Sequence, residues 1–384
     1  MLVNYYRRTL QILSSRILFQ TLPLIDLLII GGGIVGSWIA SRASKAGLSV
    51  ALCDQSHHPG DATSGRNSGV LHAGIYYTRD SLKAFHCLRG HDLTVDYLRS
   101  SKLPHQICGK LITTGADHSP EALGRLELLK QNAENIGARD LRIIEDPGKE
   151  YSGVRGQAAI VSPNTGVCDA AAYLHSVQND AKDQGTYWLN GRKVTGLSLT
   201  SSGGTVLLQD SESRSEEVHA SWIVNTAGLY SDDIAAMAGL TGIEIRPVRG
   251  EYYRLRKAHS IKKLVYPLPD PTSTALGVHY TFHPGGDAYA GPNAVAAEFK
   301  EDYRITQSAK DFAESLSRIL TGYSVDDLSP GYAGLRPRLY LQGEEFRDFY
   351  IRKEGRCIHL LGIESPGLTS AASISLSVLE MLGL

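Results

Sequence analysis

Residues 26–36 read Asp-Leu-Leu-Ile-Ile-Gly-Gly-Gly-Ile-Val-Gly, and this stretch decides the fold of the chain. Its apolar run predicts a buried strand that leads directly into a Gly-x-Gly-x-x-Gly turn and then a helix. A second apolar run, residues 48–53, ends at Asp54, 18 residues after the last glycine of the turn. This order of strand, glycine turn, helix, strand and acidic residue is typical of a unit that binds a dinucleotide.

Each part of this pattern has a physical role. Gly31 permits a tight turn, Gly33 lets the backbone approach a pyrophosphate, and Gly36 lets the helix pack closely on the strand. The start of the helix offers N–H groups and a positive dipole end to phosphates, and the carboxylate of Asp54 can accept hydrogen bonds from ribose hydroxyls. NAD and FAD are both bound in this way, so the motif alone leaves the cofactor open. The residues assigned to the dinucleotide are Gly31, Gly33, Ile34, Val35, Gly36, Asp54 and Gln55.

The composition indicates a globular chain without a charge bias. Its 384 residues suit two domains, or one domain with a second layered on it, and 42% of them are hydrophobic. With 39 basic and 40 acidic residues the formal net charge is -1, which argues against a nucleic-acid-binding protein. The five cysteines are odd in number and include no CxxC pair. We therefore expect reduced thiols and no metal site.

The first 25 residues differ from the rest of the chain. They contain three arginines (Arg7, Arg8 and Arg16) among apolar residues and no acidic residue. This composition is typical of a mitochondrial transit peptide, and the alternatives are a nonfunctional extension or a misplaced start codon. We expect a mitochondrial protein, and otherwise a cytoplasmic one. The apolar stretch 17–30 is interrupted by polar residues and falls short of about 20 clean apolar positions, so we expect no transmembrane span.

Strand–turn–helix units recur in the middle and at the end of the chain. A strand ending at residues 225–228 leads into a helix at 230–238, and a strand at 357–362 leads through a glycine turn into a helix at 368–381. Further helices are expected at 81–103, 119–136, 169–181 and 308–320. We predict an α/β fold with a discontinuous Rossmann-like cofactor domain (26–105, 155–245 and 335–384) and an inserted substrate domain of antiparallel β-sheet plus helix (106–154 and 246–334).

Four further segments carry specific patterns: Arg66-Asn-Ser-Gly-Val-Leu-His-Ala-Gly-Ile-Tyr-Tyr77, Asn225-Thr-Ala-Gly228, Gly334-Leu-Arg-Pro337 and Gly362-Ile-Glu-Ser-Pro-Gly-Leu-Thr369. Together with the glycine turn they resemble the D-amino-acid-oxidase/glycine-oxidase superfamily of FAD-dependent oxidoreductases. Segments 264–269, 276–279 and 291–293 are similar to those of its L-2-hydroxyglutarate dehydrogenase branch. The resemblance covers nearly all of residues 26–384 and implies FAD as the cofactor.

The resemblance also implies which further residues contact FAD. The loop after the second strand would run beside the isoalloxazine ring, and the turn before the last helix would direct N–H groups at the flavin, where negative charge develops on reduction. Related dimethylglycine and sarcosine dehydrogenases bind FAD covalently through a histidine of a similar segment, so a covalent link through His72 stays open. The contacts implied in this way are Ser64, Arg66, Asn67, Ser68, His72, Val194, Ala227, Gly228, Gly334, Arg336, Gly367, Leu368 and Thr369.

Arg336 resembles the arginine that binds the substrate carboxylate in glycine and D-amino acid oxidases. A guanidinium can hold a carboxylate through two parallel hydrogen bonds. A dicarboxylate such as 2-hydroxyglutarate needs a second cation or several hydroxyls as well. Tyr253, Arg254 and Arg249, on the strand expected at 246–256, are the candidates, whereas Arg338 is a candidate to assist Arg336.

Oxidation of a hydroxy acid moves a hydride from C2 to flavin N5, and the hydroxyl proton passes to a base. Histidine suits this role near pH 7. His72 and His279 are the candidate catalytic bases beside Arg336, and His279 takes the role if His72 is linked to FAD.

We therefore expect an FAD-dependent dehydrogenase that oxidises a 2-hydroxy acid, first of all L-2-hydroxyglutarate to 2-oxoglutarate, and passes electrons to an acceptor such as a quinone. One alternative is an FAD-dependent amine or amino acid oxidase of the glycine, sarcosine or D-amino acid type, which Arg336 suits equally. Another is a non-catalytic flavoprotein of the same fold that assists assembly of a respiratory complex. Some L-2-hydroxyglutarate dehydrogenases lack the Gly-Leu-Arg-Pro form at 334–337, which leaves the substrate open. The oligomeric state is not addressed by the sequence.

Overall fold

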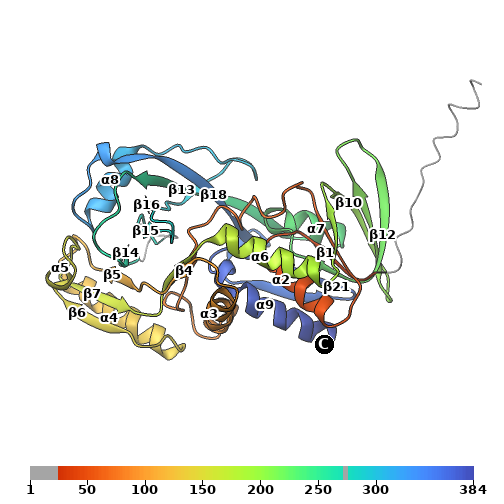
Figure 1. Cartoon of the computed structure of the whole chain (residues 1–384), viewed down its shortest axis with the longest axis horizontal. Coiled ribbons are helices and arrows are strands. Elements are labelled where there is room, and N and C mark those ends of the chain that lie inside the picture. Colours follow the sequence, from red (N-terminus) through yellow and green to blue (C-terminus); the bar gives the residue numbers. More distant parts are fainter. Residues whose placement is uncertain (1–24, 271–275) are drawn as a thin grey trace, which may run out of the picture.

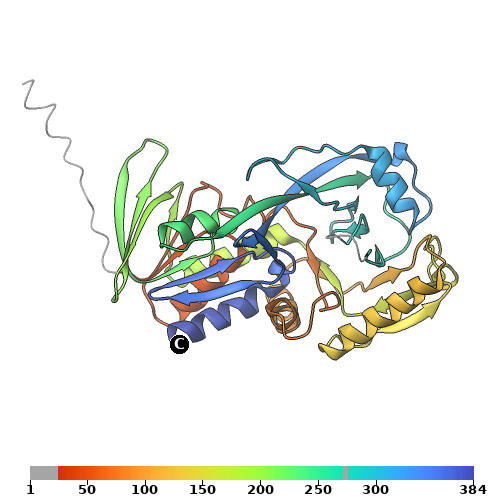
Figure 2. The ribbon, with the colours of Figure 1, turned by 180° about the vertical axis from the view of Figure 1, so that it is seen from behind.

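The computed structural model describes residues 25–270 and 276–384. The predicted targeting extension, apart from its last residue, and the segment 271–275 lie outside this range. The described residues form three sheets flanked by helices, which confirms the predicted α/β class (Figures 1 and 2). None of the helices in the described ranges is long and apolar enough to cross a membrane.

An eight-stranded sheet contains the glycine motif. Its central strand β1 (Ile25–Ile30) pairs in parallel with β2 (Val50–Asp54) on one side and β12 (Ser215–Asn225) on the other. Alternate side chains of β1 enter two different hydrophobic clusters, one on each face of the sheet. A strand buried on both faces needs apolar residues at every position, which explains the uninterrupted run in the sequence. The other strands are β9 (Tyr187–Asn190), β10 (Lys193–Leu199), β11 (Gly204–Gln209), β20 (Tyr350–Glu354) and β21 (Cys357–Leu361).

Helices cover both faces of this sheet. On one face α2 (Ile34–Lys45) packs between α6 (Ala170–Asp183) and α9 (Gly367–Leu382), and α3 (Leu82–Ser100) packs on α9 (Figure 1). The short helix α7 (Ser231–Met237) contributes to the cluster on the opposite face. Because α2 and α9 lie side by side, their N-termini open toward the same region of the molecule.

A ten-stranded sheet dominates the other half of the molecule. The antiparallel strands β13 (Ile243–Leu255) and β18 (Leu328–Leu341) pair over nearly their whole length and run from the first half into the second (Figure 2). The register shifts between Glu251 and Tyr253, which marks a β-bulge. The remaining strands are β5 (Lys110–Thr113), β6 (Arg142–Glu145), β7 (Ala158–Ser162), β14 (Leu264–Pro267), β15 (Tyr280–Phe282), β16 (Ala288–Ala290), β17 (Val295–Ala296) and β19 (Glu344–Phe346).

The smaller elements complete the described chain. The third sheet has only short strands and joins the loops beside the glycine motif to the rest of the molecule. The helices expected at 119–136 and 169–181 are α4 and α6: α4 follows the cap residue Ser119, whose Oγ accepts a hydrogen bond from Ala122 N, and α6 follows Asp169, whose Oδ1 accepts one from Ala172 N. These elements are β3 (Val70–Leu71), β4 (His105–Gln106), β8 (Gly166–Cys168), α4 (Pro120–Asn135), α5 (Pro147–Glu150), α8 (Ala309–Ser317), and the 3₁₀ turns η1 (Gly228–Tyr230) and η2 (Val325–Asp327).

The division of the chain into a cofactor domain and a substrate domain remains a prediction, and several strands do not follow its expected boundaries: β4 and β13, for example, cross those at 105–106 and 245–246. Strand β7 lies beyond the expected boundary at 154 but belongs to the ten-stranded sheet, because it pairs with β5 and β6. Strand β18 spans the expected boundary at 334–335. All five cysteines are buried free thiols, as the sequence predicts.

Candidate active site

A cavity of about 690 Å³ lies where the two large sheets meet. Its lining begins at the start of α2, continues along the loop 63–81, and includes residues of β13, β14 and β18. The turn before α9 closes it from the side of the first sheet. The predicted site residues that line this cavity are Gly33, Ile34, Val35, Ser64, Arg66, Asn67, Ser68, His72, Gly228, His279, Gly334, Arg336, Gly367 and Leu368.

The glycine turn packs directly against the end of β12. Gly31 has a positive φ of 110°, and a Cβ there would lie 2.4 Å from the carbonyl oxygen of Thr226. A Cβ on Gly36 would lie 2.0 Å from the carbonyl oxygen of Gly31. Gly31 and Gly36 therefore do not line the cavity but hold the turn in the shape that exposes the backbone of Gly33 to it.

Asp54 ties the second strand to the same turn. Its Oδ2 accepts a hydrogen bond from Gly32 N at 2.7 Å and its Oδ1 accepts one from Ser56 N at 2.8 Å. Burial raises the pKa of this carboxyl group, and the two N–H donors oppose that rise. Asp54 is absent from the cavity lining, and so are Gln55, Val194 and Ala227.

The loop after β2 is held in place by its own polar groups. Ser64 Oγ accepts a hydrogen bond from Ile34 N at 3.0 Å, at the first turn of α2. Thr63 Oγ1 donates to Leu335 O on β18, and the Asn67 side chain donates to Ser64 O. The guanidinium of Arg66 lies 4.4 Å from the ring centre of Tyr303. This loop therefore bridges the start of α2 and the strand that carries Arg336.

The N-terminus of α9 is joined to the His72 segment. Thr369 Oγ1 accepts a hydrogen bond from His72 N at 3.1 Å and donates to Val70 O at 3.3 Å. Thr369 thus lies behind the cavity wall and fixes it. The ring of His72 extends the contact, because its Nε2 lies 3.2 Å from Ser365 Oγ in the turn before α9.

His279 has a defined tautomer. Its ring stacks on Tyr266 with centroids 3.6 Å apart, and its Nδ1 lies 2.8 Å from Gly277 O. A carbonyl oxygen only accepts hydrogen bonds, so the Nδ1 atom of the neutral ring carries the proton. Nε2 is then the atom left to accept a proton.

Both histidines of the cavity are uncharged at neutral pH. Burial lowers the pKa of His72 to about 3, and the nearby positive charge of Lys110 and the ring of His279 act in the same direction. Burial also lowers the pKa of His279 to about 3, against the opposing hydrogen bond to Gly277. A neutral imidazole can accept a proton, so either ring has the charge state that a general base needs.

Arg336 presents an uncompensated positive charge to the cavity. Its two Nη atoms each lie 3.3 Å from the carbonyl oxygen of Asn293, and it forms no ion pair with any carboxylate of the described residues. The neighbouring strand leaves room for it, since a Cβ on Gly250 would lie 3.0 Å from Arg336 Nη2. The group is therefore free to bind an anion.

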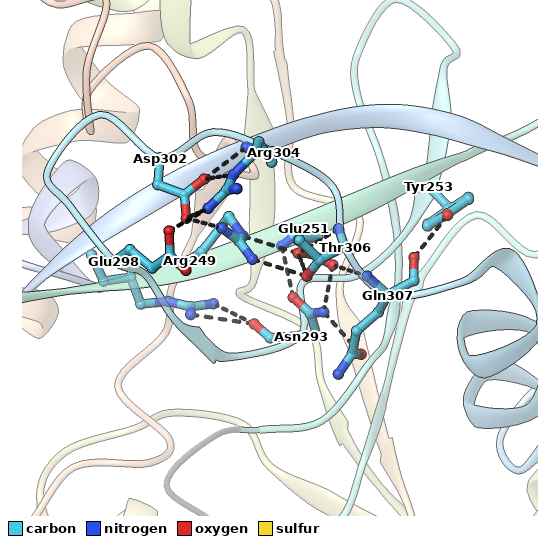
Figure 3. Close-up of polar contacts among 10 residues, drawn as sticks. Arg249, Glu251, Tyr253, Asn293, Glu298, Asp302, Arg304, Thr306 and Gln307 are labelled. Atoms are coloured by element: carbon cyan, nitrogen blue, oxygen red, sulfur yellow. Dashed lines mark hydrogen bonds and ion pairs between the residues drawn. The ribbon is translucent and has the colours of Figure 1, made fainter.

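A buried polar network fixes the acceptor of Arg336 (Figure 3). Asn293 Oδ1 accepts a hydrogen bond from Glu251 N at 2.8 Å, and Asn293 Nδ2 donates to Glu251 Oε2 at 3.0 Å. Burial alone would raise the pKa of Glu251, but the donors around it, Thr306 first, keep the pKa below its usual value. The carboxylate also pairs with the buried Arg249, which in turn pairs with Asp302.

Two predicted substrate residues lie elsewhere, which corrects the sequence analysis. Tyr253 packs on Phe312 of α8 and donates its hydroxyl to Gln307 O, so it belongs to the core of the second half. Arg254 pairs with Asp287 at 2.6 Å and its side chain is 56% exposed. The bulge at Glu251–Tyr253 turns Tyr252 toward the cavity instead.

The other predicted cations are already paired. Arg249 is buried and held by two carboxylates, as described above. Arg338 lines the cavity, but its guanidinium bonds to Glu345 at 2.8 Å and to Glu364 at 3.3 Å. Glu364 also binds Lys83. Arg336 is therefore the better of the predicted arginines for an anionic ligand.

Several residues of the cavity wall were missed by the sequence analysis. Tyr76, Tyr252 and Tyr266 line the cavity, and the buried Lys110 lies behind Tyr76 and Tyr266. The only sign in the sequence was a lysine within a strand, and the structure shows that every residue of this strand is buried. A charged residue at such a position is rare unless it has a partner or a function.

The described residues fit FAD. The N-termini of α2 and α9 open on one cavity, and each can offer N–H groups to negative charge, one to a pyrophosphate and the other to a flavin ring. Glycines 33, 228 and 367 leave the backbone uncovered at these places. No group of His, Cys, Asp and Glu side chains within 25–270 and 276–384 could hold a metal ion.

Several known proteins are similar to this chain in sequence. The chain is 37% identical over 304 residues to L-2-hydroxyglutarate dehydrogenase, mitochondrial, from Caenorhabditis elegans, covering 77% of this chain and 70% of that protein. It is 30% identical to the Homo sapiens protein of the same name, covering 91% and 87%. An Indibacter alkaliphilus L-2-hydroxyglutarate dehydrogenase is 30% identical, covering 92% and 98%.

Solved structures share the fold. FAD-bound L-alpha-glycerophosphate oxidase from Mycoplasma pneumoniae has a TM-score of 0.83 at 23% identity, covering 94% of this chain and 96% of that one. Glycine oxidase from Geobacillus kaustophilus has a TM-score of 0.77 at 16% identity, covering 94% of each chain. Residues 26–380 match the DAO family, described as FAD dependent oxidoreductase. The chain therefore belongs to the DAO family and is an FAD-dependent oxidoreductase.

Proposed function

We propose that the chain is a dehydrogenase that oxidises L-2-hydroxyglutarate to 2-oxoglutarate and passes the electrons to a carrier such as a quinone. The observation that carries this proposal is that one cavity contains both Arg336, which has no carboxylate partner among the described residues, and His279, a neutral histidine whose Nε2 can accept a proton. The names of relatives that are 30–37% identical support the choice of substrate.

The residues have separate tasks in this reaction. Arg336 binds the C1 carboxylate and orients the C2 hydroxyl. His279 accepts the hydroxyl proton at Nε2, while its Nδ1–H stays bonded to Gly277 and holds the ring in place. FAD, when bound, supplies the acceptor for the hydride of C2. Ser64, Asn67 and the backbone at the starts of α2 and α9 are the proposed cofactor contacts.

A substrate panel tests the proposal. The purified holoenzyme is mixed with a dye acceptor and, in turn, L-2-hydroxyglutarate, D-2-hydroxyglutarate, sarcosine, glycine and D-alanine. We expect dye reduction with L-2-hydroxyglutarate and little with the others. Reduction by the amines alone would instead identify an amine or amino acid oxidase. No reduction by any compound, with FAD retained, would favour a non-catalytic flavoprotein.

The Asn293→Asp variant tests how Arg336 is held. An aspartate cannot donate to Glu251 Oε2 or Gln307 Oε1, and its charge repels the Glu251 carboxylate. The Asn293 carbonyl that orients Arg336 should shift in this variant. We therefore expect the KM for the hydroxy acid to rise about tenfold, which corresponds to a loss of about 1.4 kcal/mol of binding free energy. Asn164→Asp, at a partly exposed site outside the cavity, is the control in steady-state kinetics. Equal KM values for the two variants would contradict this role of Asn293.

The attachment of FAD can be decided at His72. Its ring lines the cavity and is uncharged, which a covalent link through a ring nitrogen requires. The protein is precipitated with acid and washed. A yellow pellet that turns colourless in the His72→Ala variant indicates a covalent link, whereas a colourless wild-type pellet indicates non-covalent FAD and leaves His72 as a second candidate base.

A mitochondrial location is proposed from the composition of the first 25 residues and from the names of the eukaryotic relatives. The bacterial relative shows that enzymes of this kind are not confined to mitochondria. Fusion of residues 1–25 to a fluorescent reporter tests the idea: import into mitochondria supports it, and a diffuse signal contradicts it.

A further inference from the structure

Lys110 is a buried amine in the wall of the proposed active site. It lies on β5 with a relative exposure of 1%, and its Nζ is 4.5 Å from the ring centre of Tyr76 and 4.7 Å from that of Tyr266. In the register of β5 and β14, Lys110 is opposite Leu264, and Tyr266 follows two residues later on the same face. Both tyrosines line the cavity, and the amine, which is not itself part of the lining, lies against their ring faces.

Among the described residues, no negative charge balances this amine. Lys110 forms no ion pair with a carboxylate in the part of the chain that the structure describes. Burial raises the pKa of the Cys87 thiol to about 12 and that of the Cys108 thiol to about 11, so both are neutral. The titratable groups that face Lys110 are all uncharged at pH 7: His72, Tyr76, Cys87, Cys108, Tyr266 and His279.

The environment therefore suits a cation only when an anion is nearby. Burial lowers the pKa of Lys110 to about 7, which places the amine at the edge of ionisation. Aromatic faces attract a cation but do not replace a counter-ion in a buried site. An anion bound in the cavity would favour the charged form.

The wall also contains an unused donor. Tyr76 Oη is buried and has no hydrogen-bond partner among the described residues. Buried hydroxyls usually have a partner, so this one points to a ligand that accepts a hydrogen bond. Tyr76 and Lys110 together offer one donor and one positive charge at the same part of the cavity wall.

We propose that Tyr76 and Lys110 form the site for the second carboxylate of a dicarboxylic hydroxy acid, while Arg336 binds the first. This proposal rests on the function proposed above. The remaining cations of the cavity lining have other partners: Lys83 and Arg338 pair with Glu364, Arg347 pairs with Glu345, and the Arg66 guanidinium lies over the ring of Tyr303. Selection of dicarboxylates over monocarboxylates would then come from Lys110 and Tyr76, and not from a further arginine.

Proton uptake on ligand binding tests the proposal without turnover. Glutarate and butyrate lack the hydroxyl group that is oxidised, so both can be titrated calorimetrically into the holoenzyme at pH 7 in buffers of different ionisation enthalpy. Because a group at its pKa is half protonated, we expect glutarate binding to take up about half a proton. Butyrate should take up much less. In Lys110→Met the uptake should vanish and glutarate should bind about tenfold or more weakly.

Matched variants separate this effect from a general loss of structure. Lys263→Met removes a lysine that lies outside the cavity and donates from Nζ to Cys108 O. This variant should leave the proton uptake on glutarate binding unchanged. Tyr76→Phe removes only the hydroxyl, and it should weaken the binding of glutarate while leaving the binding of butyrate unchanged. This variant keeps the proposal testable even if Lys110→Met does not fold. The proposal would be overturned if Lys110→Met showed the proton uptake and the glutarate affinity of the wild type, or if Tyr76→Phe bound glutarate as tightly as the wild type.

The pH dependence gives an independent readout. The ammonium is lost as the pH rises through the pKa of Lys110, so glutarate should bind more weakly at pH 8 than at pH 6, with no such change in Lys110→Met. Oxidation of L-2-hydroxyglutarate together with a failure of these tests would refute only the second-carboxylate site. Proton uptake on glutarate binding, without oxidation of any hydroxy acid, would refute only the proposed function.

Discussion

We expect Arg336→Ala to lower kcat/KM for L-2-hydroxyglutarate by about 100-fold or more. Truncating one member of a desolvated charge pair costs about 2–5 kcal/mol, and each 1.4 kcal/mol corresponds to a factor of ten. The guanidinium has no carboxylate partner among the described residues, so its removal breaks no ion pair of the protein. The fold and the FAD content should therefore survive, and steady-state kinetics with the holoenzyme measures the loss.

Arg254→Ala is the matched control, because it removes the arginine that the sequence analysis named as a candidate for the second carboxylate. Its guanidinium pairs with Asp287 at the surface, and such a pair contributes about 0–1 kcal/mol. We expect activity within about twofold of the wild type. A large loss in Arg254→Ala with a small loss in Arg336→Ala would reverse the assignment of the carboxylate site.

The second large effect is expected at the glycine turn. In Gly31→Ala the new methyl group would lie 2.4 Å from Thr226 O and 2.7 Å from its carbonyl carbon, both of them backbone atoms. The ends of β1 and β12 would have to separate, and overpacking of this kind costs about 1–3 kcal/mol in addition to the strain of a positive φ. We expect a lower free energy of unfolding and a purified protein with most of its FAD lost.

Gly47→Ala supplies the control for strain alone. Gly47 also has a positive φ, 92°, but nothing lies within 4 Å of a Cβ placed there. Comparison of the two variants by thermal unfolding and by flavin absorbance isolates the clash with β12. Equal stability and equal FAD content would mean that the close approach of Gly31 to Thr226 is not essential for cofactor binding.

The fold was predictable because its signals are local. The apolar run of β1, the glycine turn and the capping residues Ser119 and Asp169 each act within a few residues of the chain. The loop at 63–72 and the turn at 365–369 were found by resemblance, and the structure brings them to one cavity. Their common position depends on the packing of α9 beside α2, which no single segment specifies.

The substrate side was harder to predict for two physical reasons. Strand alternation assigns faces to Tyr253 and Arg254 only if the strand is regular, and the bulge after Glu251 breaks that pattern. A lysine in a strand is common, and Lys110 becomes unusual only because the groups around it are uncharged, which the sequence does not show. Both facts arise from contacts between distant segments, which a single sequence does not contain.

The long pairing of β13 and β18 has a consequence for the range of ligands. These strands form a paired ribbon with one β-bulge that runs from the first half of the molecule into the second, and Arg336 lies near the middle of β18. Tyr76 follows the His72 segment, which Thr369 attaches to α9. In the proposed site, Arg336 and Tyr76 would be anchors on these two supports, so a diacid of matching length would reach both, and a shorter or longer one would leave a carboxylate without its partner.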